Sequence, residues 1–247
     1  MTIVARRLAN WLPARKPGSH VVKRLGVAWY FAQQVEGVPR RIAVASRWAL
    51  LKVEGHLFDG YYRLWGLDTK GPDFDHEFDG SSDFVGYVPS PWRVLRTLFP
   101  ADSLRHDDVL LEYGSGKGRV VVWVVSRFRL QRVIAVDHNH DSLSVAQDNL
   151  ENWRGQLRCR DVTFAYQRAA EFEVPDDVTV VYFYNPFIGE TFHRVLVHLG
   201  ASLARNPRTL RVIYLVPLMH DALVDAGFTV VRTHEDLFYP WTMYSIG

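Results

Sequence analysis

From Asp108 towards the C-terminus, short apolar runs alternate with stretches that repeat their apolar residues at helical spacing. The short runs predict strands, and the periodic stretches between them predict helices. Near-continuous apolar strands separated by helices are typical of a parallel sheet that is covered on both faces. The predicted strands span residues 108–114, 132–137, 161–167, 178–185 and 210–216, and the predicted helices span residues 119–128, 141–153, 190–203 and 220–226.

The C-terminal end of the chain breaks this alternation. Residues 228–236 and 238–247 form two strand-like runs with a very short connection, which favours an antiparallel hairpin at the edge of the sheet. The sequence therefore predicts an α/β fold, with a doubly wound, mostly parallel seven-stranded sheet that ends in an antiparallel hairpin.

An amphipathic helix is predicted nearer the N-terminus, over residues 40–53. Its sequence, RRIAVASRWALLKV, has charged residues at both ends, and apolar or small residues dominate between them. One face of this helix carries Ile42, Ser46, Ala49 and Val53.

The acidic, glycine-rich residues 68–83 form the clearest interruption in the chain and predict a domain boundary. We therefore expect a basic, mostly helical N-terminal extension over residues 1–80 and one α/β domain over residues 81–247. Shortly after the interruption, Ser90 is placed to cap a short helix that has Pro91 in its first turn.

The net charge of +2 hides a strong asymmetry along the chain. Residues 1–52 contain ten Lys and Arg against one acid, a net charge of +9, which leaves −7 for the remainder. A basic arm on an acidic body favours contact with a polyanion or with an anionic membrane surface. The alternative is a solvated basic helix that lies on the acidic body of the same chain.

The single cysteine, Cys159, excludes an intramolecular disulfide framework and a zinc cluster built on cysteines, and we expect it to pack in the core. No apolar stretch approaches the about 20 residues that a membrane-spanning helix needs, and residues 26–32 are too short. We expect a cytoplasmic protein without a metal site. Peripheral contact with a membrane through the basic arm stays open.

Three glycines follow the first predicted strand, in the stretch LLEYGSGKGR (residues 110–119). Glycine permits the positive φ of a sharp turn and lets other atoms approach the backbone without a Cβ clash. The spacing G-x-G-x-G is one residue shorter than the dinucleotide fingerprint G-x-G-x-x-G. Glu112 stands two residues before the first glycine, and Asp137 ends the next strand, where a carboxylate can accept both hydroxyls of a ribose. The combination indicates an adenosine site without a pyrophosphate; a NAD-type domain and an unliganded turn are the alternatives.

On these residues the chain resembles the class I S-adenosylmethionine-dependent methyltransferases, over residues 85–247. The resemblance implies that the E-x-G-x-G-x-G stretch holds the methionine end of S-adenosyl-L-methionine. It also implies that Asp137, after the second strand, holds the ribose. The residues implied in the first role are Glu112, Gly114, Ser115, Gly116 and Gly118.

A second stretch, YVPSP at residues 87–91, is similar to the Y-V-P-x-S segment ahead of the glycine loop in seven-strand protein-lysine methyltransferases. This similarity implies that Tyr87 and Pro89 lie over the cofactor. The alternative is that the Ser-Pro pair only starts a helix.

The adenine end of the site is less complete. His138, beside Asp137, is expected to border the adenosine. After the third strand, many members of the family carry an acid that bonds the adenine amino group, whereas this chain has Arg168 there. We therefore carry the adenine contact over only to Ala169 and Ala170.

The stretch FYNPF, residues 183–187, follows the fourth strand, where the family places its acceptor site. Asn185 offers a carbonyl that can accept a hydrogen bond from an amine, and Pro186 stiffens the turn that aims it. Tyr184 and Phe187 could wall the acceptor or hold a cationic amine. The stretch resembles the N-P-P-[YF] box of enzymes that methylate nucleobase amino groups, with one proline missing. A plain strand-end turn with core aromatics is the alternative.

These residues predict an enzyme that transfers a methyl group from S-adenosyl-L-methionine to a nitrogen, a lysine-type amine of a protein. An ammonium acceptor must first lose a proton, and Tyr184, Glu190 and His193 are the candidate bases. Two other enzymes remain open, namely a small-molecule N- or O-methyltransferase and an enzyme that transfers another group, such as aminopropyl. The alternative of another class is a nucleic-acid or membrane-surface binding protein with a non-catalytic cofactor fold.

Overall fold

The computed structural model describes residues 38–70 and 87–247. Its strands confirm the predicted alternation, with ends that differ by at most three residues. The strands are β1 (Val109–Tyr113), β2 (Arg132–Asp137), β3 (Val162–Tyr166), β4 (Val180–Phe183), β5 (Leu210–Leu215), β6 (Thr229–His234) and β7 (Trp241–Ile246).

Helices connect the strands as the periodicity predicts. The helix before the sheet is much longer than expected, because it continues from the predicted residues 40–53 to Leu64. The helices are α3 (Val38–Leu64), α4 (Trp92–Leu98), α5 (Arg119–Val125), α6 (His140–Glu151), the 3-10 turn η1 (Ala169–Glu171), α7 (Gly189–Arg205) and α8 (His220–Asp225).

All seven strands form one sheet, in the order β3-β2-β1-β4-β5-β7-β6. Strands β1 to β5 are parallel to one another, and β7 runs antiparallel between β5 and β6. The predicted fold class and its terminal hairpin are therefore confirmed. The winding reverses beside β1, and in open α/β sheets ligands bind beyond the carboxyl ends of the strands at that point.

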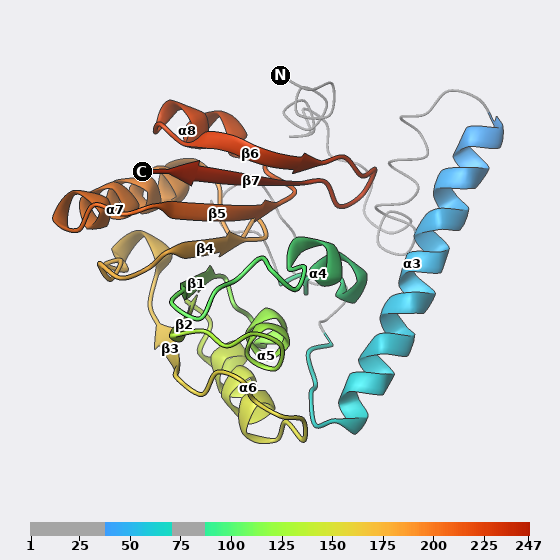
Figure 1. Cartoon of the computed structure of the whole chain (residues 1–247). Coiled ribbons are helices and arrows are strands. Elements are labelled where there is room, and N and C mark those ends of the chain that lie inside the picture. Colours follow the sequence, from blue (N-terminus) through green and yellow to red (C-terminus); the bar gives the residue numbers. More distant parts are fainter. Residues whose placement is uncertain (1–37, 71–86) are drawn as a thin grey trace.

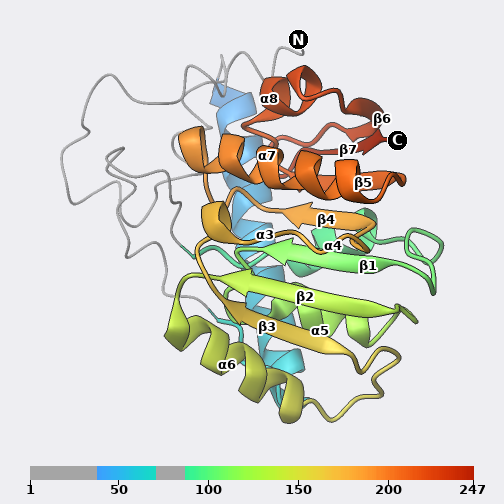
Figure 2. The same cartoon turned by 90° about the vertical axis from the view of Figure 1, so that its left-hand side faces the viewer.

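Helices cover both faces of the sheet. Figure 2 shows α7 and α8 over the near face, with α4 and α5 behind the strands. In Figure 1, α3 lies outside α4 and α5 as a further layer on that side of the sheet. Within the described ranges, no helix combines the length and apolarity that crossing a membrane requires.

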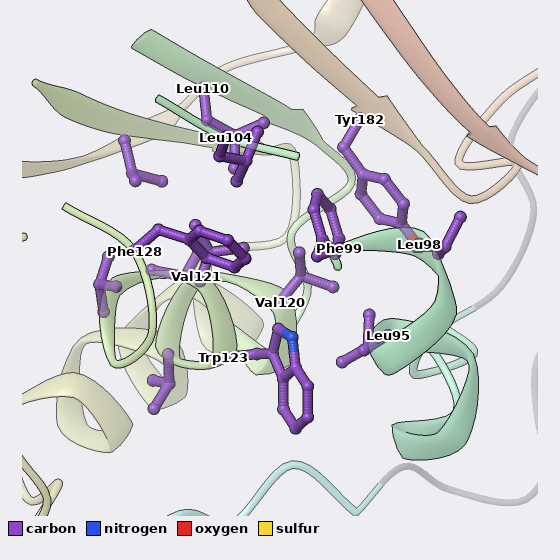
Figure 3. Close-up of a cluster of buried hydrophobic side chains, with 14 of the residues drawn as sticks. Leu95, Leu98, Phe99, Leu104, Leu110, Val120, Val121, Trp123, Phe128 and Tyr182 are labelled. Atoms are coloured by element: carbon purple, nitrogen blue, oxygen red, sulfur yellow. The ribbon is translucent and has the colours of Figure 1, made fainter. Parts of the chain in front are cut away.

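The core under α4 and α5 is built from large side chains of these two helices and of the strands beneath them (Figure 3). Leu95 of α4, Val121 and Trp123 of α5, and Tyr182 of β4 are each at most 3% exposed. Full burial of an apolar side chain stabilises a fold by about 1.5–3 kcal/mol, so this cluster fixes α4 and α5 against the sheet. Cys159 is also buried in this cluster, as the sequence analysis expects.

The inner side of α3 packs on this layer through a few specific contacts. The ring of Tyr62 stacks on Trp92 with centroids 4.0 Å apart, and Asp59 pairs with Arg119. Nearer its N-terminus, Arg47 forms an ion pair with Asp236 in the connection between β6 and β7. The helix thus contacts both α4 and the terminal hairpin.

Two local predictions have different outcomes. Ser90 does not cap α4, so that prediction is wrong: Pro91 occupies the N-cap position, and the Ser90 hydroxyl lies 2.8 Å from the Tyr182 hydroxyl. Most of the predicted boundary at residues 68–83 lies outside the described residues. The division into an extension over residues 1–80 and a domain over residues 81–247 stays a prediction.

Candidate functional site

The glycine loop connects β1 to α5 at the carboxyl end of the sheet. Gly114, Gly116 and Gly118 all have positive φ, at 70°, 51° and 73°. Residues with a Cβ rarely adopt this left-handed region, so the backbone path itself requires glycine. The N–H of Gly114 donates to the carbonyl of Val136 over 2.8 Å, which holds the start of the loop against the end of β2.

Atoms of the protein itself lie against each of these glycines. A Cβ on Gly114 would overlap Pro186, and a Cβ on Gly116 would overlap the ring of Tyr87. A Cβ on Gly118 would lie 2.9 Å from the Cβ of Ala146 in α6. The glycines therefore bring the turn after β4, the ring of Tyr87 and helix α6 against one loop. The close packing of the third glycine is also its role in dinucleotide-binding loops.

Tyr87 covers the loop from the side of the N-terminal extension. Its hydroxyl donates to the carbonyl of Thr69 over 2.9 Å, and the Lys117 ammonium lies 5.8 Å from its ring centroid. Burial raises the pKa of this phenol above its usual value, so it remains a hydrogen-bond donor at neutral pH. The ring lies against Gly116, and the implied place of Tyr87 over a cofactor stays a prediction.

Asp137 ends β2 beside the loop. Its Oδ2 accepts from the Gly116 N–H over 2.7 Å, and its Oδ1 accepts from the Asn139 N–H over 2.9 Å. Each carboxylate oxygen has two lone pairs, so hydroxyls of a ribose can still bind. The exposed ring of His138 lies beside the carboxylate, with Nδ1 3.8 Å from Oδ1.

Glu112 lies under the loop and is almost completely buried. It is 3% exposed, and its Oε2 has no hydrogen-bond partner within the described ranges. Burial raises the pKa of this carboxyl well above its usual value, and the negative charge of Asp137 raises it further. A buried carboxyl with one unpartnered oxygen is costly to ionise, and a bound ammonium group would offset that cost.

Asn185 has a positive φ, and its side-chain amide has a hydrogen-bond partner for the nitrogen but not for the oxygen within the described residues. Its φ is +41°, which asparagine tolerates better than most residues. The side-chain amide donates from Nδ2 to the carbonyl of Val216 over 2.6 Å. Its Oδ1 is buried and has no partner among the described residues, and the same is true of the Ser115 hydroxyl in the glycine loop.

The aromatic neighbours of Asn185 point to different roles. Phe187 is 2% exposed and packs on Tyr113 and Phe183, so its ring belongs to the core. Tyr184 is half-buried and lies against the cluster under α4 and α5. Burial raises the pKa of the Tyr184 phenol well above its usual value. Of these two rings, that of Tyr184 is the more exposed, and its contact with an acceptor stays a prediction.

At the adenine end, Ala170 lies in the 3-10 turn η1 and is half-buried. Its carbonyl oxygen is 3.1 Å from Nε2 of His198, which ties the turn to α7. Arg168, the residue in place of the usual acid, is exposed at the start of the turn. The acid of the same turn, Glu171, is exposed three residues after Arg168, and the contact with adenine stays a prediction for Ala169 and Ala170.

Sequence reasoning missed two residues that hold the end of the extension against the loop. Arg119 donates from Nη2 to Asp59 over 2.7 Å and from Nε to the Thr69 hydroxyl over 2.8 Å. Asn149 exchanges hydrogen bonds with the backbone of Asp68 over 2.7 and 2.9 Å. The partners of both residues lie far away in sequence, so local spacing carries no signal for them.

These residues fit S-adenosyl-L-methionine. The buried Oε2 of Glu112 and hydroxyl of Ser115 offer acceptors for an ammonium group, and Asp137 offers acceptors for a ribose. S-adenosyl-L-methionine has no phosphate group, so its site needs no phosphate-binding loop. The G-x-G-x-G spacing, one residue shorter than the dinucleotide fingerprint, is compatible with such a site. Within the described residues, no cluster of His, Cys, Asp and Glu is arranged to hold a metal ion.

Comparison with known proteins gives one sequence relative. No protein-family model matches the chain. The chain is 28% identical over 67 residues to a protein-lysine N-methyltransferase of Saccharolobus islandicus (strain REY15A). This match spans 27% of the chain and 42% of that relative.

Solved structures give a broader likeness in fold. A precorrin-6y C5,15-methyltransferase of Geobacter metallireducens superposes with a TM-score of 0.50 and 16% identity, over 69% of this chain and 96% of that one. An RNA methyltransferase of Salinibacter ruber in complex with S-adenosyl-L-homocysteine gives a TM-score of 0.48 and 18% identity, over 64% and 94% of the two chains. With its strand order and terminal hairpin, the chain has the seven-strand, Rossmann-like fold of the class I S-adenosylmethionine-dependent methyltransferases.

Proposed function

We propose that the chain is an S-adenosylmethionine-dependent methyltransferase that methylates an amine nitrogen of the kind a protein lysine carries. The observation that supports the acceptor most is the buried, unpartnered Oδ1 of Asn185, in the turn that packs against the glycine loop. A carbonyl oxygen in this position can accept the N–H of an incoming amine. The sequence relationship to a protein-lysine N-methyltransferase agrees with this choice.

The cofactor would be held by the residues around the glycine loop. Glu112 and Ser115 would bind its ammonium group, and Asp137 would bind its ribose. When bound, S-adenosyl-L-methionine supplies an electrophilic methyl group with its own leaving group, so the protein mainly aligns the acceptor and excludes water. The ring of Tyr87 would close the site on the side of the extension.

The acceptor amine must be neutral when it reacts. Tyr184 is a poor base, because burial raises its pKa and keeps the phenol protonated. Glu190, exposed in the first turn of α7, is the carboxylate to which a water path could lead. Asn185 would orient the amine, and the half-buried ring of Tyr184 would line its alkyl chain.

The test is methyl transfer to defined acceptors. The full chain is incubated with S-adenosyl-L-methionine and lysine-rich synthetic peptides, and mass spectrometry reads the mass gain of one or more methyl groups. The variant Asn185→Gly removes the amide while glycine still adopts the positive φ, so it is expected to fold and to lose at least 100-fold in rate. Asn206→Gly, at the exposed C-cap of α7, is the matched control and should keep full rate.

The outcomes separate the alternatives. Methylation of small amines or hydroxyls with no methylated lysine would support the small-molecule enzyme. Adducts heavier than methyl groups would support transfer of another group. Full activity of Asn185→Gly would contradict the proposed role of the amide. The acceptor, a cytoplasmic location and a contact of the basic arm with a polyanion or membrane all remain proposals.

A further inference from the structure

Helix α3 has a second apolar face that points away from the rest of the molecule. Its large apolar residues are more than half exposed, although the opposite face of the helix is half-buried, with Val44 and Tyr62 buried. The exposed residues are Ile42 (60%), Leu50 (70%), Val53 (58%), Leu57 (70%), Tyr61 (52%) and Leu64 (74%).

These side chains form one continuous stripe. At 3.6 residues per turn they fall on the same side of the helix, and the residues between them on that side, Ser46, Ala49 and Gly60, are small and uncharged. The stripe runs from residue 42 to residue 64, which corresponds to about 33 Å of helix. A contiguous exposed apolar surface of this kind marks an interaction site rather than scattered surface residues.

The charges of α3 are distributed unevenly around the stripe. Both described acids turn towards the protein, because Asp59 binds Arg119 and Trp92, and Glu54 lies 3.8 Å from Arg93. Among the bases, Arg47 pairs with Asp236 of the terminal hairpin, whereas Arg63, Lys52 and His56 lie on one flank of the stripe. The side chain of Arg63 is 74% exposed and lies 3.9 Å from the exposed carboxylate of Asp68.

From this combination we infer that the outer face of α3 binds an anionic lipid surface, with the stripe in the headgroup region and the flanking bases near the lipid charges. Interfacial helices have an apolar face with Lys and Arg on its flanks, and aromatic residues are common at the same depth. Tyr61 and Trp65, both exposed, lie at the C-terminal end of the stripe. The basic residues 1–52, with their net charge of +9, would add to the same attraction.

Charge argues against two other occupants of this face, namely a second copy of the chain and the chain's own residues 1–37. In an antiparallel two-fold pair of α3 helices, the basic flank of one copy would meet the same flank of the other, and like charges oppose that contact. Residues 1–37 carry six Lys and Arg against one acid, so they too would bring positive charge to a basic flank. An anionic membrane is the partner whose charge complements this face.

The test is sedimentation of the full chain with vesicles of phosphatidylcholine alone or mixed with an equal part of phosphatidylserine. The double variant Leu50→Glu/Leu57→Glu places charges in the stripe and is expected to lower binding to the anionic vesicles at least tenfold. The control variant Val231→Glu changes another exposed apolar residue, 65% exposed in β6, and should bind as the wild type does. Lys52→Gln/Arg63→Gln should weaken binding to the anionic vesicles only.

Folding is checked by S-adenosyl-L-homocysteine binding and thermal unfolding, which the exposed substitutions should leave unchanged. Analytical ultracentrifugation of the same proteins reports a second copy. The inference would be overturned if the wild type binds neither vesicle, if the stripe variant binds as well as the wild type, or if the stripe variant converts a dimer into a monomer without any vesicle binding. These readouts do not depend on methyl transfer.

Discussion

Two groups of buried or half-buried polar residues lie around the glycine loop and the strand that leads into it, and they differ in how they are paired. The anchor cluster comprises Asp59, Thr69, Arg119 and Asn149, whose side chains bond to one another or to the backbone. The loop cluster comprises Glu112, Ser115 and Asn185, and each has a buried oxygen without a partner in the described ranges.

The difference separates residues that hold the fold from residues that bind a ligand. A buried polar group without a hydrogen bond costs about 1–3 kcal/mol, so the fold retains the loop cluster at the expense of its own stability. The anchor cluster carries no such cost, because its hydrogen bonds are made within the chain. We therefore expect substitutions in the two clusters to have opposite effects on stability and on binding.

The largest expected effect is that of Arg119→Met in the anchor cluster. The change leaves the carboxylate of Asp59 without its buried partner and should lower the free energy of unfolding by about 3–5 kcal/mol. Urea denaturation of the apoprotein measures it. Arg105→Met, at an exposed position, is the control and should change stability by less than about 0.5 kcal/mol. Equal stability of the two variants would contradict the claim that the anchor cluster stabilises the fold.

A smaller loss is expected from Gly118→Ala, at the contact between α5 and α6. The alanine would be held at a φ of +73° with its Cβ 2.9 Å from Ala146, a cost of about 1–3 kcal/mol. Gly200→Ala, in the middle of α7 with no atom within 4 Å of its Cβ, should instead stabilise by about 0.5–1 kcal/mol. Thermal unfolding of both variants measures whether each substitution raises or lowers stability. A stabilised Gly118→Ala would contradict the positive φ and the close packing of Gly118.

The smallest change in stability is expected from Glu112→Gln in the loop cluster, and this change depends on pH. The folded protein raises the pKa of this carboxyl above that of the unfolded chain, so its protonated form stabilises the fold at acidic pH. That contribution is lost as the pH rises from the unfolded pKa towards the raised one. The variant should match the wild type in acid and exceed it by about 1 kcal/mol near neutral pH, while binding of S-adenosyl-L-homocysteine weakens at least tenfold.

Melting curves of the apoproteins at several pH values, together with calorimetry, measure this pair of effects. Ser115→Ala is the companion variant, which removes a hydroxyl from the same cluster without a pH dependence. If Glu112→Gln loses stability at every pH and still binds normally, the carboxyl is structural and the comparison between the clusters fails.

The sequence predicts the sheet well because periodicity and turn chemistry are local signals. All seven strands, the helices between them and the positive φ of the glycine loop follow from patterns of a few residues. These local patterns do not predict which residues pack against the glycines, because Pro186, Tyr87 and Ala146 come from three separate parts of the chain. The same reason hides the pairing of Arg119 with Asp59, 60 residues away.

The site was predicted unevenly for related reasons. Pro186 lies against Gly114 of the loop, whereas Phe187 turns into the core. Both orientations are compatible with the same five-residue pattern, so only the packing of β4 and α7 decides between them. The long α3 was only half predicted, because its C-terminal half mixes two apolar faces that no single amphipathic pattern describes.

The central claim is that the glycine loop and the acid at the end of β2 bind S-adenosyl-L-methionine, and calorimetry tests it most directly. S-adenosyl-L-methionine, S-adenosyl-L-homocysteine and NAD are titrated into the wild type and into Asp137→Ala. The account predicts micromolar binding of the two sulfur compounds to the wild type, its loss in the variant, and no binding of NAD. Tight binding of NAD with no response to either sulfur compound would contradict it.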